Sequence, residues 1–152
     1  MGRGNGGYTE KQPYYRDSMN NKVTDQGAIF VAERYIDQGF EVVFRQDQTP
    51  GKHYDLTIKD SSDTVFVKNI EVKKMTSENP GQIAKNIKRA FEQLDNTPNG
   101  TVALYFENHT KTESIIDVIK AGYKEAKRKN NVHGNVEVWF KDKTCMVFTT
   151  EE

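Results

Sequence analysis

The spacing of hydrophobic and polar positions changes along the chain, and each change marks the boundary of a predicted element. Apolar residues recur at intervals of three and four over three stretches, which predicts helices over about 24–38, 79–94 and 112–129. Short apolar or alternating runs predict strands at 39–44, 54–58, 65–74, 101–106, 136–140 and 144–148. The predicted order is therefore a helix, three strands, a helix, a strand, a helix and two strands (αβββαβαββ).

Residues with specific backbone roles lie at the ends of these elements. Thr24 or Asp25 can cap the first helix, and Gly39 ends it. Ser77 or Asn79 can cap the second helix. Pro80 falls in the first turn of that helix, where its missing N–H costs little. The caps therefore agree with the helix boundaries that the periodicity predicts.

The order of elements predicts an α/β (α+β) fold in which helices flank a mixed central sheet. The first three strands are close in sequence and predict a meander. The strand at 101–106 is apolar throughout, as expected of a central strand covered on both faces. A single domain is expected over 23–152. The glycine-rich, polar residues 1–22 show no period and are expected to form a flexible lead or a linker from a longer parent protein.

Two of the predicted strands carry polar residues that can form one site. Side chains of a strand alternate between its faces, so Glu71 and Lys73 project together while Ile70 and Val72 pack behind them. Asp55 is the odd polar residue of the preceding strand. An Asp–Glu pair can hold Mg²⁺ and leave positions open for water and a phosphate, while a lysine orients the attacking water. The pattern thus predicts hydrolysis of phosphodiesters.

The same pattern is also typical of a half-exposed strand, with Asp55 as a surface residue beside a turn. The context favours the catalytic interpretation, because both strands are apolar on their other face and a helix follows directly. That helix has a polar and basic side, which includes Lys85, Arg89 and Gln93. Glu33 lies at the edge of the apolar stripe of the first helix and is either a solvated glutamate or a further carboxylate that reaches the metal.

Charge is balanced overall but uneven along the chain. The formal net charge is zero, which provides no global field to attract nucleic acid. Residues 24–67 contain eight acidic and four basic residues, whereas 68–94 and 111–130 each contain six basic and three acidic residues. The two basic segments flank the predicted site and give limited support to phosphate binding.

Several classes of protein are disfavoured by composition. Cys145 is the only cysteine, so an internal disulfide is excluded, and its apolar surroundings indicate a packing role. The three histidines show no spacing typical of metal ligands. No apolar stretch reaches the roughly 18 residues that span a bilayer, and no signal sequence is visible. We therefore expect no membrane insertion by this segment.

The element order, with Asp on the second strand and Glu-x-Lys on the third, resembles the PD-(D/E)xK superfamily of restriction-endonuclease-like nucleases. Within it, the chain is most similar to the CdiA-type tRNA nuclease toxin domains of contact-dependent growth inhibition systems. The similarity covers about residues 24–106. The matching stretches are AERY at 32–35, GFEV at 39–42, YDL at 54–56, IEVK at 70–73 and AFEQ at 90–93.

The resemblance implies a role for each matching residue. Asp55 and Glu71 would ligate Mg²⁺ or Mn²⁺, and Glu33 would help to hold the metal or its water. Lys73 would position or activate the attacking water, and Gln93 would contact the site from the helix. The pattern departs from the family at the usual proline, which is replaced by Tyr54. That proline shapes a turn and does no chemistry, so no ligand is lost.

Four further residues near these motifs are expected to contact the substrate. They are His53, Lys74, Lys85 and Arg89. The resemblance also implies that the chain is the C-terminal piece of a secreted or cell-surface protein and is delivered into the cytoplasm of a target cell. The implied substrate is tRNA, and the implied partner is a cognate immunity protein that blocks the site.

Two alternatives remain open at this stage. A DNase with the same metal site cannot be separated from an RNase, because no RNA-reading module is visible. A non-catalytic module that binds nucleic acid or protein agrees better with the zero net charge. A serine or cysteine hydrolase is disfavoured, since no nucleophile motif is present.

Overall fold

A computed structural model describes residues 7–45, 54–60, 66–76, 78–94, 99–130 and 134–149. The elements in chain order are α1 (Gln26–Asp37), β1 (Phe40–Phe44), β2 (Leu56–Asp60), β3 (Phe66–Met75), α2 (Pro80–Gln93), β4 (Gly100–Phe106), α3 (Glu113–Asn130), β5 (Asn135–Phe140) and β6 (Cys145–Phe148). This order is the one predicted from periodicity. It confirms the α/β (α+β) class.

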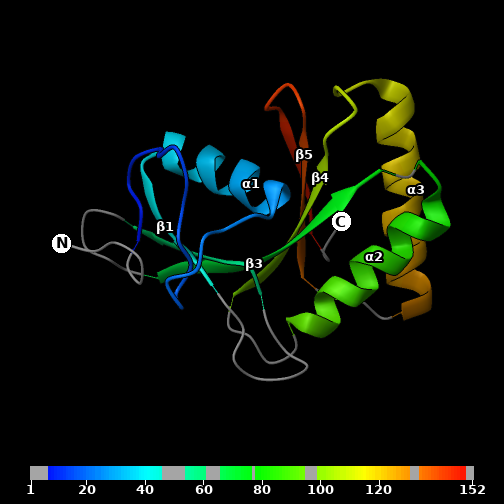
Figure 1. Cartoon of the computed structure of the whole chain (residues 1–152). Helices are drawn as coiled ribbons and strands as arrows, with labels where there is room; N and C mark the ends of the chain where they lie inside the picture. Colours follow the sequence, from blue (N-terminus) through cyan, green and yellow to red (C-terminus); the bar gives the residue numbers. More distant parts are fainter. Residues whose placement is uncertain are drawn as a thin grey trace.

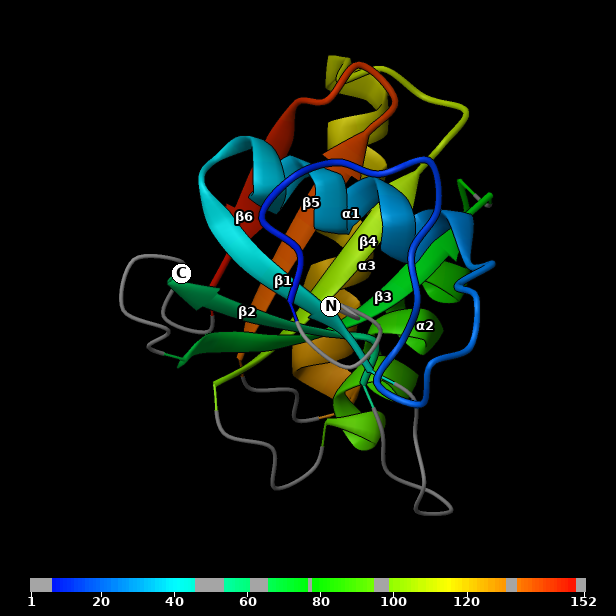
Figure 2. The same cartoon turned by 60° about the vertical axis from the view of Figure 1, so that its left-hand side comes forward.

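The six strands form one mixed sheet in the order β1-β2-β3-β4-β5-β6 (Figure 1). The first three strands are antiparallel and form the predicted meander. β3, β4 and β5 are parallel, because α2 and α3 return the chain to the same edge between them. β5 and β6 close the sheet as an antiparallel hairpin. Figures 1 and 2 show α1 on one face of the sheet and both α2 and α3 on the other.

Local sequence explains where the first two helices begin. The Asp25 side chain accepts a hydrogen bond from the Ala28 N–H at 3.1 Å, so Asp25 is the cap of α1. Asn79 caps α2 in the same way, and Pro80 occupies the first turn as predicted. The chain leaves α1 through Gly39, whose φ of +96° favours glycine.

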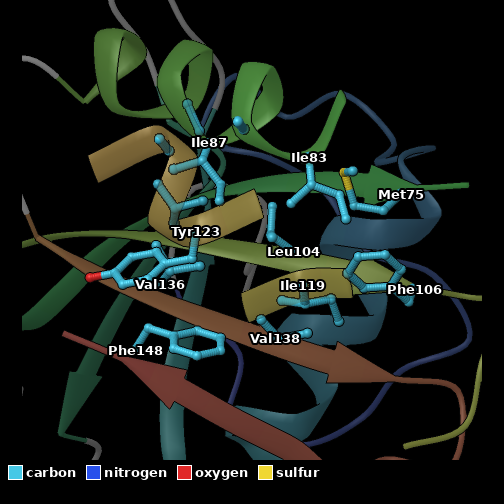
Figure 3. Packing of buried hydrophobic residues seen from close by; sticks show 14 of the residues in the cluster. Met75, Ile83, Ile87, Leu104, Phe106, Ile119, Tyr123, Val136, Val138 and Phe148 are labelled. Carbon is cyan, nitrogen blue, oxygen red and sulfur yellow. The ribbon is translucent and has the colours of Figure 1, made fainter. Parts of the chain in front are cut away.

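Two hydrophobic cores lie on opposite faces of the sheet. One fills the space between the sheet and the pair α2 and α3 (Figure 3). The second lies between the sheet and α1. Leu104 belongs to the first core and Ala103 to the second, which confirms β4 as a central strand covered on both faces. In the described part of the chain, none of the helices has the length and apolarity needed to cross a membrane.

The N-terminal segment packs against β1, in contrast to the expected flexible lead at 1–22. Tyr8 and Val42 exchange backbone hydrogen bonds of 2.8 and 2.9 Å, and Tyr15 is only 1% exposed. The rings of Tyr8, Tyr15 and Phe44 lie within 4.9 to 6.2 Å of one another. The expected boundary at residue 22 is therefore wrong for residues 7–22, which belong to the packed domain.

Candidate active site

Asp55 lies directly before β2 and is held against β3 by its backbone and its side chain. Its N–H donates to the Ile70 carbonyl at 2.9 Å, and its carbonyl accepts from the Arg45 N–H at 2.8 Å. Its Oδ2 accepts from the Val72 N–H at 2.8 Å. Burial raises the pKa of Asp55, and the Val72 N–H partly offsets this effect. The Asp55 carboxylate is thus fixed beside Val72, the residue that follows Glu71 in β3.

Glu71 is a buried acid on β3 and is only 3% exposed. Its Oε2 lies 3.3 Å from Lys73 Nζ. Its Oε1 is buried and has no hydrogen-bond partner among the described residues. Burial, followed by the negative charge of Asp55, raises the pKa of Glu71 to about 8. The carboxyl groups of Asp55 and Glu71 therefore interact electrostatically across the β2–β3 pair.

Lys73 connects this acidic pair to α2. Its Nζ donates to Gln93 Oε1 at 2.6 Å and contacts Glu71 Oε2 at 3.3 Å. Gln93 is the last residue of α2, so the end of that helix lies over β3. The structure thus brings together Asp55, Glu71, Lys73 and Gln93, four of the residues predicted from the sequence.

Glu33 lies outside this group. Its Oε2 accepts a 2.7 Å hydrogen bond from the Tyr15 hydroxyl, which ties it to the N-terminal segment. Within the described ranges, no three His, Cys, Asp or Glu side chains are grouped so that they could hold a metal ion. The structure therefore does not place Glu33 as a third metal ligand. The acidic side chains that meet are those of Asp55 and Glu71.

The residues predicted to bind substrate are dispersed. Lys85 and Arg89 are exposed on α2, on the side of the sheet that carries Lys73. Lys74 points to the opposite face of β3, where it forms a 3.2 Å ion pair with Glu107. Lys74 therefore does not join Glu71 and Lys73, and its contact with the substrate stays a prediction. His53 lies outside the described residues.

Asp25, which the sequence predicts only as a helix cap, also acts on Asp55. Its negative charge raises the pKa of Asp55 further, after the larger effect of burial. Asp25 and Asp55 also line the same cavity of about 160 Å³. Lys22 and Arg45 contribute positive charge to its wall. No motif signals this role, because it depends on how α1 is placed against β2.

No family model, curated protein or solved structure matches the chain. Its function is therefore inferred from the chemistry of the site. Two adjacent carboxylates, one with an unpaired buried oxygen, offer ligands to a hard cation, since Mg²⁺ is often held by only one or two carboxylates and water. The neighbouring Lys73 ammonium offers a donor and a positive charge to an anionic substrate.

Proposed function

We propose that the protein is a metal-dependent nuclease of the PD-(D/E)xK type, an endoribonuclease that cleaves tRNA. The observation that carries this proposal is the buried Glu71 Oε1 atom, which has no donor among the described residues. A buried acceptor without a partner costs about 1–3 kcal/mol, and more when it is charged. A bound cation would remove that cost at Glu71, and Asp55, whose charge acts on Glu71, would be the second carboxylate to hold it.

Asp55 and Glu71 are the residues that would hold Mg²⁺ or Mn²⁺. When bound, such an ion acts as a Lewis acid on a phosphate and lowers the pKa of a bound water. The chain contributes the fixed position of Asp55, which the Val72 N–H holds at 2.8 Å. It also excludes solvent around Glu71, which strengthens every electrostatic interaction at this point.

Lys73 provides the positive charge of the site. Gln93 Oε1 accepts from its Nζ at 2.6 Å and holds the ammonium next to Glu71. From there it can donate to an attacking water or to a phosphate oxygen, and its charge opposes the negative charge that develops on phosphorus-bound oxygens. Gln93 is accordingly a positioning residue, because it acts through Lys73.

The order of the elements supports a restriction-endonuclease-like core as part of this proposal. Asp55 precedes the second strand, the Glu-x-Lys pair lies on the third, and a helix ending in Gln93 leads to a parallel strand. On this proposal the domain is the effector of a contact-dependent inhibition toxin that acts in the cytoplasm of a target cell. A cognate immunity protein would block it.

A cleavage assay with matched variants tests the proposal. Purified protein is incubated with total tRNA or plasmid DNA, in Mg²⁺ or in EDTA. We expect Mg²⁺-dependent cleavage of tRNA that Lys73→Ala abolishes and Lys111→Ala retains, because Lys111 is an exposed lysine before α3. Intact tRNA and plasmid in every lane, with protein that is folded by circular dichroism, would contradict a nuclease. Cleavage of plasmid alone would identify a DNase.

A non-catalytic binding module is the second candidate. It is favoured by the engagement of Lys73 with both Glu71 and Gln93, since such a network can also be purely structural. Expression in a sensitive cell separates the two functions. If wild type inhibits growth and Lys73→Ala inhibits it equally, the binding module is supported and the nuclease is not.

A further inference from the structure

The cavity beside Asp55 contains charged groups that the proposed reaction does not use. Its volume is about 160 Å³, the share of about five waters at roughly 30 Å³ each, and below the roughly 300–1,000 Å³ typical of small-molecule sites. A group of a few heavy atoms, such as one phosphate, suits this space, whereas a whole nucleotide is too large for it. The charged residues of its wall are Asp17, Lys22, Asp25, Arg45 and Asp55.

The cavity lies on the α1 side of Asp55. Ala28 and Phe44, two further residues of its wall, belong to the core between the sheet and α1. Lys73, in contrast, contacts Gln93 of α2 on the other face of the sheet. A phosphate in the cavity would therefore lie on the side of Asp55 that faces away from Lys73.

The two cations of this wall have no acidic partner. Neither Lys22 nor Arg45 forms an ion pair with any described residue, although three carboxylates line the same cavity. Lys22 Nζ lies 5.5 Å from the centre of the Tyr14 ring, and Arg45 Cζ lies 5.7 Å from that of Tyr54. Such contacts are weak at exposed positions, so both cations are available to an anionic ligand.

The three carboxylates of the wall are held by backbone N–H groups. Asp17 Oδ1 accepts two such hydrogen bonds, of 2.9 and 3.0 Å. Asp25 Oδ1 accepts one of 3.1 Å, and Asp55 Oδ2 accepts one of 2.8 Å. The negative charge of Asp25 also raises the pKa of Asp55, so these two carboxylates repel each other. Acids and bases thus line one small space without pairing, which leaves each group free for a different ligand.

The formal charge of the wall depends on whether a metal is bound. Three carboxylates and two cations give a net charge of −1, which disfavours a phosphate. A divalent ion on Asp55 adds two positive charges and changes the total to +1, since a bound cation is often the largest local charge of a site. Lys22 and Arg45 therefore become a favourable phosphate site once the metal is in place.

We propose that Lys22 and Arg45 bind a phosphate of the RNA substrate next to the one that is cleaved, and that they do so when the metal occupies Asp55 and Glu71. Charge-assisted hydrogen bonds from lysine and arginine are the strong contacts that proteins make to phosphate. The RNA strand would pass Asp55, from Lys73 on one side to this pair on the other. The inference rests on the proposed nuclease function and deepens it, because it makes the N-terminal segment part of the substrate site and places metal binding before substrate binding.

Binding of uncut RNA with and without metal tests the inference. A fluorescein-labelled, unstructured oligoribonucleotide is titrated with Lys73→Ala, which is expected not to cleave, in Mg²⁺ or in EDTA at equal ionic strength, and fluorescence anisotropy is measured. Addition of Lys22→Gln with Arg45→Gln is expected to weaken binding about tenfold or more in Mg²⁺ and less than about threefold in EDTA. Lys22→Arg keeps the charge and is expected to retain affinity within about threefold.

Lys111→Gln with Lys141→Gln is the matched control, because both lysines are exposed outside the cavity and their loss changes the net charge equally. The control pair is expected to change affinity less than about twofold in either condition. Equal losses in the two pairs would overturn the proposal, as would an equal loss for the cavity pair in Mg²⁺ and in EDTA. A polyglutamate peptide that displaces the RNA as well as unlabelled RNA does would also overturn it and would indicate an acidic protein partner. Circular dichroism verifies the fold of each variant.

The cleavage assay separates failure of this inference from failure of the proposed function. If wild type cleaves tRNA in Mg²⁺ and the Lys22 and Arg45 pair can be replaced without loss of affinity, the nuclease is supported and the phosphate site is not. If the RNA binds in Mg²⁺ through this pair and is never cleaved, the phosphate site is supported and the nuclease is not.

Discussion

Replacement of Glu71 by glutamine is expected to stabilise the metal-free protein at neutral and alkaline pH. Glu71 is buried beside Asp55, and its Oε1 has no hydrogen-bond partner among the described residues. The ion pair with Lys73 offsets only part of this cost, because the pKa of Glu71 is still raised. Glutamine has nearly the same shape and no charge, so it removes the unfavourable burial and retains the packing.

The pKa of Glu71 sets the sign and the size of the effect. The pKa is about 8 in the folded chain, against 4.5 for the ordinary carboxyl group. Between these values the folded state binds more protons than the unfolded state, so stability falls as pH rises from about 4.5 to 8. At pH 7 the pKa difference acts over about two and a half pH units, or at most about 3.4 kcal/mol at 1.36 kcal/mol per unit. We expect a measured gain of about 1–3 kcal/mol at pH 7 and a smaller gain at pH 5.

Urea unfolding in EDTA at several pH values measures this gain. Glu92→Gln on α2 is the control, because Glu92 is exposed and its only described ion pair, with Lys88, is 3.9 Å long. Addition of Mg²⁺ is expected to stabilise wild type and to have little effect on Glu71→Gln. A Glu71→Gln variant that is less stable than wild type at pH 8 without metal would refute the conclusion that this charge is poorly compensated.

The remaining predictions concern other parts of the molecule. Glu33→Gln is expected to retain full cleavage of tRNA in the Mg²⁺ assay, since Glu33 is bonded to Tyr15 and not to the site. Deletion of residues 1–22 is expected to lower the free energy of unfolding in urea by about 3 kcal/mol or more, because it removes buried Tyr8 and Tyr15. Glu137→Gln is expected to destabilise the protein by about 2–3 kcal/mol at pH 7 in urea unfolding.

The fold was predictable where one face of each element is apolar. The order of helices and strands followed from hydrophobic periodicity, because burial of one face is what makes these elements stable. The convergence of Asp55, Glu71 and Lys73 was also predictable, since strand alternation and an antiparallel neighbour are both local properties of the chain. The same alternation places Lys74 on the other face of β3, away from Glu71 and Lys73.

Other features depend on tertiary packing and leave no periodic signal. Tyr8 and Tyr15 are buried from an irregular segment, because their rings meet Phe44 and not because of their spacing. Asp25 comes to line the same cavity as Asp55 only after α1 is placed against the sheet. The hydrogen bond between Glu33 and the Tyr15 hydroxyl likewise depends on how the N-terminal segment packs and has no signal in the spacing of α1.

The two buried glutamates of this sheet differ in how completely their oxygens are paired. Glu137 on β5 is also 3% exposed, but both of its oxygens have partners. Trp139 Nε1 donates to its Oε1 at 3.1 Å, while Lys68 Nζ at 2.6 Å and the Tyr35 hydroxyl contact its Oε2. A glutamine at 137 would leave Lys68 without its counter-charge, whereas a glutamine at 71 replaces a carboxyl group whose raised pKa shows that its charged form is incompletely compensated. If Glu71→Gln raises the free energy of unfolding and Glu137→Gln lowers it, the two equally buried carboxyl groups differ in role. Glu137 would then be structural, and Glu71 would be a carboxylate retained for a ligand.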